Sequence, residues 1–278
     1  MSRERVPAAG CAPKLTGSNE PEGKWCRVLI GHGDVSAVYC ALDSGCGLYF
    51  MLTLHHLENS RSQRILWLLE ELGVEYRIKR YKRDAKTGLA PPELLAVHPL
   101  GKSPVITDGD LTIAESGAIV EYLVGNYDDG RLLPAAGTPE RLAYTYWLHY
   151  AEGSFMPLMI VSLILNRIET APMPFFIKPV AKGIAAKVHA SYLDHNVTRN
   201  LDFMESSLQK SAWFCGNEMT AADIQMSFAV EAAEVRTNLS TSYPRLAAFL
   251  AKIRALPAYQ AALERGGPYQ LMGGNPSR

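Results

Sequence analysis

The pattern of hydrophobic and polar positions divides the chain into regions of different character. The first fifty residues mix Pro, Gly, Ser and charge without a sustained period of two or 3.6. Strand-like alternation starts at Met51 and is interleaved with helical periods, and further along only helical periods remain. The predicted units are an N-terminal extension over 1–50, an α/β domain over 51–128, a linker over 129–138, an all-helical domain over 139–272 and a tail over 273–278.

The α/β domain is predicted to hold four strands and three helical segments. Apolar residues at positions 65, 68, 69 and 72 repeat as on one face of a helix, and Gly73 ends it. Asp108-Gly109 is a hairpin signal between two short apolar runs. The predicted order is a strand at 52–56, a helix at 61–72, a strand from 76–78, a helical turn at 91–96, strands at 105–106 and 111–113, and a helix at 116–127.

The rest of the chain is predicted to be helical. Helical periods cover 139–168, 176–210, 221–236 and 244–264. The fold class is therefore α/β followed by all-α, with no internal repeat.

Two explanations remain open for residues 1–50. They are an artefactual extension from an upstream start codon, with Met51 the true start, or a genuine disordered tail. An intact native mass from Met1 would contradict the first explanation.

Composition and charge exclude several function classes. The chain is 47% apolar, which allows a sizeable core, and its 28 basic residues equal its 28 acidic ones, so no basic excess favours nucleic acid. The apolar run from Phe155 to Leu165 is too short to cross a bilayer, and no secretory leader is evident, so we expect a cytoplasmic protein without a membrane partner. The Cys and His spacings match no metal site, and no metal is expected.

Three polar segments are candidates for chemistry. Residues 59–64 stand at the start of the first helix, where they could cap it or bind an anion. Ser103-Pro104 precedes a strand, and base rates favour an ordinary trans bond over a cis bond that would expose the Ser103 backbone. Glu115 and Ser116 begin the third helix, either as a cap with a solvated acid or as a site for an ammonium and a carboxylate.

A fourth segment looks structural. Thr220 is placed to cap the helix that follows it, and Asp223 stands three residues on, where it can complete a capping box.

In their order and spacing, residues 59–64, 99–105, 115–119 and 214–224 resemble the glutathione transferase superfamily. The first three resemble its glutathione-contacting segments and the fourth its folding motif. The resemblance runs from about Met51 to Met272 and is closest to the fungal and bacterial transferases of the yeast Gtt type. It implies a thioredoxin-like domain with a mixed four-stranded sheet, followed by an all-helical substrate-binding domain.

The resemblance also implies roles for individual residues. Glu115 and Ser116 would bind the γ-glutamyl end of glutathione, and Ser103, beside a cis Pro104, would pair its backbone with the cysteinyl part. Lys102 would lie near the glycyl carboxylate.

The thiol would lie at the start of the first helix, where a hydroxyl and the helix dipole could stabilise the thiolate. Ser60 is the first candidate for this donor, followed by Asn59 and then Ser62. Asn59 at a usual hydroxyl position, and His98 where the family often has Asn, are departures from the family pattern.

The implied function is transfer of glutathione to small hydrophobic electrophiles, with reduction of organic peroxides as a further activity. The alternatives are a non-catalytic protein that binds glutathione or hydrophobic ligands, and a structural interaction module. A homodimer is implied, formed through the third helix and the first long helices of the second domain. Candidate walls for the electrophile are aromatic and Met residues with helical spacing, most of which we expect in the core: Tyr144, Trp147, Tyr150, Phe155 and Met159.

Overall fold

The computed structural model describes residues 25–28, 38–41, 51–84, 87–237, 239–267, 269 and 271. Within the N-terminal extension it describes one antiparallel pair, β1 (Trp25–Val28) with β2 (Val38–Ala41). This pair is an exception to the lack of regular structure expected over residues 1–50. The predicted domain boundaries stay predictions. The tail over 273–278 lies outside the described residues.

The predicted mixed four-stranded sheet is confirmed, with the order β4-β3-β5-β6. Central β3 pairs in parallel with β4 and antiparallel with β5, which pairs antiparallel with β6. Leu54 stands opposite Ile78 on one side and Ile106 on the other. The strands are β3 (Thr53–Leu57), β4 (Arg77–Tyr81), β5 (Val105–Asp108) and β6 (Leu111–Ala114).

Three helices belong to this domain: α1 (Ser62–Leu72), α2 (Pro92–Val97) and α3 (Ser116–Tyr127). Gly73 ends α1 in the left-handed conformation at φ 65°, which glycine adopts without a steric cost. The apolar side of α1 packs with α3 over the sheet, whereas α2 contributes Leu94 to a separate small cluster with Leu57 and Tyr81.

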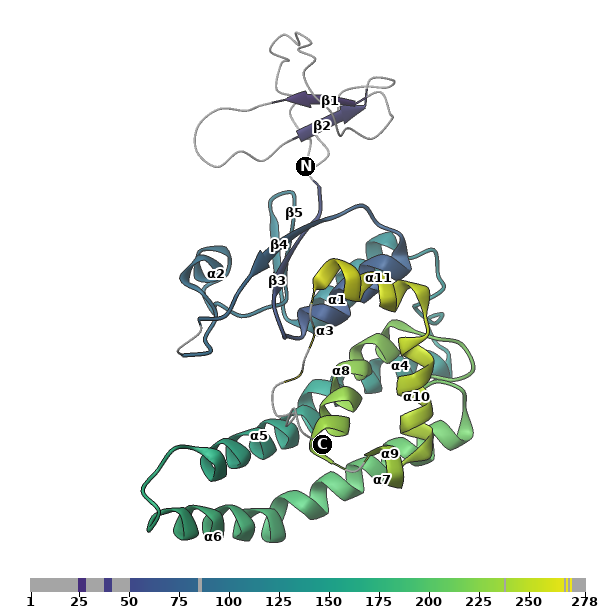
Figure 1. The fold of residues 1–278 in the computed structure, drawn as a ribbon. Helices are drawn as coiled ribbons and strands as arrows, with labels where there is room; N and C mark the ends of the chain where they lie inside the picture. Colours follow the sequence, from purple (N-terminus) through teal and green to yellow (C-terminus); the bar gives the residue numbers. More distant parts are fainter. Residues whose placement is uncertain are drawn as a thin grey trace.

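The second domain is all-helical among the described residues, as predicted. Figure 1 shows α5 and α6 extending side by side away from the sheet, with α7 continuing from α6. The helices are α4 (Pro139–Tyr150), η1 (Ala151–Phe155, a π-helical turn), α5 (Met156–Thr170), α6 (Lys178–Val188), η2 (His189–Leu193, also π-helical), α7 (Asp194–Lys210), α8 (Ala221–Arg236), α9 (Leu239–Ser242), α10 (Pro244–Arg254) and α11 (Pro257–Gly266).

The two domains share one hydrophobic core. Leu66 and Ile119 of the first domain belong to the same buried cluster as Val230 of α8. The C-terminal helix α11 also returns to lie on α1 (Figure 1). A Cβ at Gly266 would stand 2.5 Å from the Gln63 side chain and 2.8 Å from Leu66, so the close approach of α11 to α1 requires glycine there.

The capping box at the start of α8 is confirmed. The buried Asp223 carboxylate accepts the backbone N–H of Thr220 at 2.8 Å and that of Phe214 at 2.9 Å. Burial raises the pKa of Asp223 to about 6.

Several element boundaries differ from the predictions. The period over 244–264 is broken before Pro257 into α10 and α11, because Pro257 has no N–H to continue the first helix. Short α9 was not predicted. Ser116 was expected to cap α3, but it is the first residue of that helix, and Glu115 occupies the N-cap position.

The sequence was expected to contain no membrane span. The helical run Pro139–Thr170, 32 residues with a mean hydropathy of 1.4 in its most apolar window, is nevertheless long and apolar enough to cross a membrane by length and composition. The π-helical turn η1 joins α4 and α5 into this one run. In the fold its α4 part packs against α8, where Tyr144, Trp147 and Leu148 are buried.

Candidate functional site

Three buried polar side chains meet where β3 leads into α1, and we call them the serine cluster: His56 of β3, Ser60 of the connecting loop and Ser62, the first residue of α1. The Ser60 and Ser62 hydroxyl oxygens are 2.8 Å apart, and Ser60 Oγ accepts the Ser62 backbone N–H at 3.2 Å. Ser62 Oγ lies 2.8 Å from His56 Nδ1 and 3.3 Å from the Leu57 carbonyl oxygen. These contacts turn both serine hydroxyls toward the sheet.

The proton positions in the serine cluster follow from the state of His56. Burial, with a contribution from Arg80, lowers the pKa of His56 to about 4, so the ring is neutral at pH 7 and carries one N–H. The ring also hydrogen-bonds the Gly266 backbone carbonyl, which takes that N–H. Nδ1 is then an acceptor, so Ser62 donates to it and Ser60 donates to Ser62. Both hydroxyl protons are committed inside the cluster.

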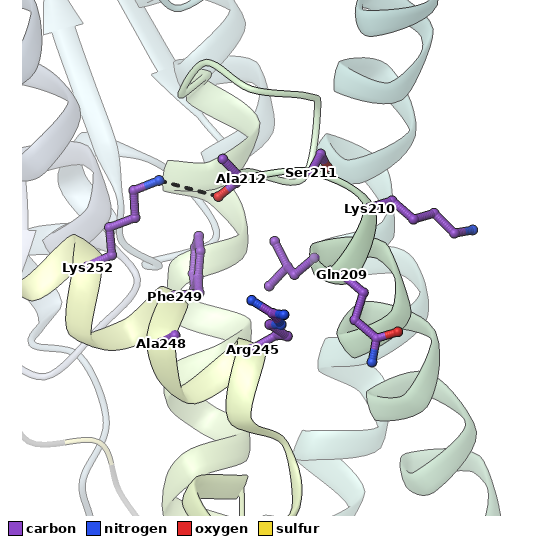
Figure 2. Close-up of a pocket in the computed structure, with 9 residues that line it drawn as sticks. Gln209, Lys210, Ser211, Ala212, Arg245, Ala248, Phe249 and Lys252 are labelled. Carbon is purple, nitrogen blue, oxygen red and sulfur yellow. Dashed lines mark hydrogen bonds between the residues drawn. The ribbon is translucent and has the colours of Figure 1, made fainter.

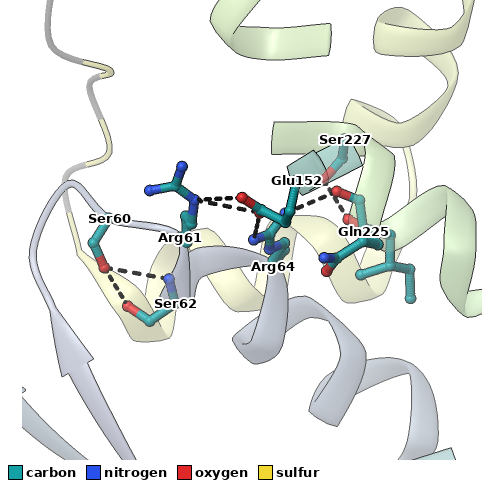
Figure 3. Close-up of polar contacts among 8 residues, drawn as sticks. Ser60, Arg61, Ser62, Arg64, Glu152, Gln225 and Ser227 are labelled. Atoms are coloured by element: carbon teal, nitrogen blue, oxygen red, sulfur yellow. Dashed lines mark hydrogen bonds and ion pairs between the residues drawn. The ribbon is translucent and has the colours of Figure 1, made fainter. Parts of the chain in front are cut away.

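A second group, the arginine cluster, is formed by Arg61, Arg64 and Glu152. The two arginines are three residues apart, so they share a face of the first turn of α1. The Arg61 Nε donates to the two Glu152 oxygens at 3.2 and 3.3 Å, and Arg64 forms an ion pair with the same carboxylate (Figure 3). Arg64 also donates to the Gln225 carbonyl oxygen at 2.9 Å, which joins α1 to α8.

Exposure differs sharply within the arginine cluster. The Arg64 side chain is 1% exposed, whereas those of Arg61 and Glu152 are 32% and 33% exposed. Burial pushes the pKa of Glu152 upward, but the two guanidinium groups outweigh it and hold the pKa below its usual value. Glu152 is therefore ionised at neutral pH, and its place on the π-helical turn η1 lets it reach both arginines from the second domain.

The second predicted segment lies where β5 begins. The Ser103–Pro104 peptide bond is cis, as the resemblance implied and against the trans bond that base rates favoured. The Ser103 hydroxyl donates to the His55 carbonyl oxygen at 2.8 Å and accepts the Leu57 N–H at 3.2 Å. Ser103 is thereby fixed against β3, and its side chain is committed to the fold.

The third segment is the start of α3. Glu115 is exposed and has φ 69°, one of two described non-glycine residues with positive φ. Such a conformation costs of order 1–3 kcal/mol and is found most often at functional sites. Its side chain makes no cap hydrogen bond with α3, and the next residue, Ser116, is buried.

These segments border one cavity of about 260 Å³. All five residues predicted to contact glutathione line it: Lys102, Ser103, Pro104, Glu115 and Ser116. The remaining lining residues are Arg61, His98, Leu100, Ala114, Glu152 and Ile160. The predicted thiol-activating residues Asn59, Ser60 and Ser62 are all described, and none of them is among the lining residues.

The sequence analysis assigned no individual role to five lining residues: Arg61, Leu100, Ala114, Glu152 and Ile160. Arg61 had a signal, because it stands at the helix start inside the polar segment 59–64. Glu152 had none, since it is 91 positions from Arg61 in sequence. Ile160 belongs to an exposed apolar stripe of α5 that continues through Ile164 and Ile168.

The five candidate wall residues of the electrophile site are in the core, where most of them were expected. Tyr144, Trp147, Tyr150, Phe155 and Met159 are each at most 7% exposed, and none lines the cavity. They lie on the inner side of the helical run, whereas Ile160 stands on the side that faces the cavity.

Among the described residues no group of three or more His, Cys, Asp or Glu side chains could hold a metal ion. His56 is buried on β3. The free Cys215 is buried, and burial raises the pKa of its thiol to about 12.

A cavity of about 340 Å³ lies elsewhere, between the end of α7 and α10 (Figure 2). Arg245, Phe249 and Lys252 line it, and Lys252 donates to the Ala212 carbonyl oxygen at 3.3 Å. None of the predicted site residues reaches this second cavity.

Comparison with known families gives two matches. A model of the glutathione S-transferase N-terminal domain matches residues 51–125, and a model of the glutathione S-transferase C-terminal domain matches residues 171–265.

Among curated relatives, glutathione S-transferase 3 of Schizosaccharomyces pombe is 35% identical over 215 residues, covering 77% of this chain and 88% of the relative. Glutathione S-transferase 1 of Saccharomyces cerevisiae is 34% identical over 223 residues, covering 77% and 95%.

Two solved structures of glutathione transferases are also similar to this chain. A glutathione S-transferase from Actinobacillus pleuropneumoniae superposes with a TM-score of 0.65 and 35% identity, covering 78% of this chain and 93% of that one. A sphingomonad glutathione S-transferase complexed with glutathione gives a TM-score of 0.59 and 25% identity, covering 77% and 98%.

Proposed function

Because the chain belongs to the glutathione S-transferase family, we propose that it binds glutathione in the 260 Å³ cavity and adds the glutathione thiolate to electrophilic small molecules. The observation that carries this proposal is the convergence of Lys102, Ser103, Pro104, Glu115 and Ser116 on that cavity. These residues come from separate stretches of chain. The structure of a related transferase complexed with glutathione supports the choice of ligand.

The charges of the cavity match the two ends of glutathione. The Glu115 carboxylate would bind the γ-glutamyl ammonium, and the N–H groups at the start of α3 would bind the neighbouring carboxylate. Exposed Lys102 would bind the glycyl carboxylate. The backbone of Ser103 would pair with the cysteinyl part, which places the sulfur toward the start of α1.

The electrophile would lie on the side of the cavity formed by α5. Ile160, Ile164 and Ile168 are 44%, 50% and 41% exposed and follow one another at helical spacing. Burying an apolar substrate on this stripe is favourable because it removes apolar surface from water. The chemistry is attack of the thiolate on an electrophilic carbon. Reduction of organic peroxides is a further proposed activity, in which two glutathione molecules are oxidised to their disulfide and the peroxide is reduced to an alcohol and water.

A second candidate function is non-catalytic binding of glutathione or hydrophobic ligands. It is favoured by one observation: the serine cluster holds its hydroxyl protons away from the cavity. If no other group activates the thiol, binding without turnover would result.

Both candidates are tested with the protein beginning at Met51. Isothermal calorimetry measures glutathione binding, and an assay with a chlorinated nitrobenzene measures transfer. Glu115→Gln should weaken glutathione binding at least tenfold, about 1.4 kcal/mol, because an ionic hydrogen bond is lost. Lys210→Gln, on the second cavity, is the matched control and should bind as the parent does. Binding that Glu115→Gln leaves unchanged would contradict the placement of glutathione.

We also propose a cytoplasmic homodimer with a role in detoxification. Leu142 and Tyr146 on α4 and Phe203 on α7 are 74%, 47% and 42% exposed, and the two rings contact each other at 6.1 Å between centroids. This apolar surface lies on the helices implied by the family resemblance. Light scattering at micromolar concentration should give twice the chain mass, and Leu142→Glu should give the monomer. A monomeric parent protein would overturn the dimer.

A further inference from the structure

The start of α1 presents one polar side chain to the cavity, and it is an arginine. Ser60 and Ser62 are 7% and 0% exposed, and their hydroxyl protons are taken by Ser62 and His56. Arg61, between them, occupies the N-cap position of α1 and lines the cavity. The thiol that the proposed function brings to this place would therefore meet a guanidinium before it meets a hydroxyl.

We propose that Arg61 stabilises the thiolate of bound glutathione, and that Glu152 is the positioning residue that holds Arg61 toward the cavity. The inference rests on the proposed function. It assigns the activation of the thiol to a residue other than Ser60, Asn59 or Ser62.

The geometry leaves Arg61 free to act on an anion. Its Nε is used by the Glu152 carboxylate, whereas its two terminal nitrogens point away from Glu152 (Figure 3). The guanidinium carbon lies 5.2 Å from the centre of the Phe228 ring, which supports it from α8. Glu152 and Phe228 thus limit the positions of Arg61, and the N–H groups of its two terminal nitrogens remain for a sulfur anion.

The surrounding charge favours an anion as well. The arginine cluster carries two cations and one anion, so its net charge is +1. Burial lowers the pKa of Arg236 on α8, and the nearby charge of Arg61 lowers it further. The charged groups that line the rest of the cavity are Lys102 and Glu115, with titratable His98 beside them.

The step itself is a simple ionisation. The S–H bond of glutathione breaks, its proton passes to solvent water, and the electron pair stays on sulfur. Arg61 keeps its positive charge throughout, because a guanidinium is not deprotonated in proteins. The positive charge and the terminal N–H donors of Arg61 then stabilise the thiolate more than the neutral thiol, which lowers the pKa of the thiol from about 8.5.

A pH titration of the thiolate absorbance of bound glutathione in the ultraviolet tests the inference without turnover. Arg61→Ala should raise the pKa of the bound thiol by about one unit or more, and Arg61→Lys should restore part of the shift because it keeps the charge. Ser60→Ala should raise it by less than Arg61→Ala does. Arg245→Ala, an exposed arginine of the second cavity, is the matched control and should leave the thiol pKa as in the parent.

Glu152→Gln tests the positioning role. Loss of the Glu152 charge alone would lower the thiol pKa, whereas loss of the held position of Arg61 would raise it. We expect the second effect to prevail, so Glu152→Gln should raise the thiol pKa by less than Arg61→Ala, with the pH profile of kcat/KM moving in parallel. Because Glu152 also neutralises buried Arg64, the circular dichroism of Glu152→Gln is compared with that of the parent. If Glu152→Gln does not fold, the Arg61 variants alone decide whether Arg61 stabilises the thiolate.

The outcomes separate the two proposals. A parent protein that binds no glutathione in calorimetry overturns the proposed function and this inference with it. Glutathione binding with an unchanged thiol pKa in Arg61→Ala, or a larger shift in Ser60→Ala, overturns the inference alone.

Discussion

The serine cluster and the arginine cluster flank the same turn of chain but differ in what they face. The serine cluster contacts β3 and the end of α11 and is closed to the cavity. The arginine cluster contacts η1 and α8 and borders the cavity. Neighbouring residues of one polar segment thus serve opposite purposes: the serines fix the loop, and the arginines join the domains and present charge to a ligand.

This difference shows that residue type alone does not identify which side chain of a polar segment contacts the ligand. A serine at a helix start is equally suited to bind the backbone or a ligand, and here the buried neutral His56 decides between them by taking the proton of Ser62. The four predictions below test the comparison, beginning with the largest effect.

Removal of Glu152 should have the largest effect on stability. Glu152→Ala leaves the Arg64 guanidinium, 1% exposed, without its anion, and losing one partner of a buried ion pair costs about 3–5 kcal/mol. Urea unfolding measures the loss. Glu234→Ala, which removes a partly exposed pair with Arg254, is the control and should cost far less. Equal losses would show that Arg64 does not depend on Glu152.

Ser62→Ala should follow, with a loss of about 1–3 kcal/mol. It leaves the buried Nδ1 of His56 without a donor and the Ser60 hydroxyl proton without an acceptor. Urea unfolding at pH 7 measures it, and Ser206→Ala on the exposed side of α7 is the control. A loss of stability without a shift in the thiol pKa would support a purely structural role for the serine cluster. A shift as large as that of Arg61→Ala would contradict this role.

Acid should destabilise the protein through its buried histidines. Burial lowers the pKa of His56 to about 4, with Arg80 contributing, and that of His55 to about 4, with Lys79 contributing, whereas an unfolded histidine titrates near 6.5. Between these values the unfolded chain binds more protons, so the free energy of unfolding falls as the pH falls. Asp223, whose pKa burial raises to about 6 from 3.8, binds its proton in the folded state and opposes the trend.

The measurement for this effect is urea unfolding between pH 6.5 and 5. His56→Gln should flatten the pH dependence by up to about 1.4 kcal/mol per pH unit, the value for one proton. His149→Gln is the control. If the free energy of unfolding of His56→Gln varied with pH as steeply as that of the parent, His56 would not be a neutral buried residue in the folded protein.

Ser60→Ala should have the smallest effect, about 0.5–1.5 kcal/mol. It removes an acceptor from the Ser62 N–H at the first turn of α1, a loss comparable to that of a helix cap. Thermal unfolding followed by circular dichroism measures it. A loss larger than that of Ser62→Ala would reverse the order of donors assigned to the serine cluster.

Much of the fold was predictable because it depends on local patterns. The period of residues 65, 68, 69 and 72 with Gly73 gave α1, and Asp108-Gly109 gave the β5–β6 hairpin. The folding motif at Thr220 and Asp223 depends on residues three apart and was also found. The split of 244–264 was missed because the apolar period continues through Pro257, although Pro257 cannot continue the hydrogen-bond ladder.

The candidate site was predictable only in part. Lys102, Ser103, Pro104, Glu115 and Ser116 were identified from short segments and converge on one cavity. The choice among Asn59, Ser60 and Ser62 could not be made from sequence, because it depends on where their hydroxyl and amide groups point. The exposed stripe that begins at Ile160 was missed because apolar residues with helical spacing predict a buried helix face.

The sequence by itself determined most of the strands, helices and caps, since these follow from periodicity and short-range capping, and the family resemblance of its motifs implied the mixed sheet and the segments that border the cavity. Only the tertiary structure decided which side chains face that cavity. Glu152 meets Arg61 across 91 positions, and His56 meets the Gly266 carbonyl across the whole folded core. Such contacts depend on the packing of η1 and α11 against α1, which no local pattern encodes.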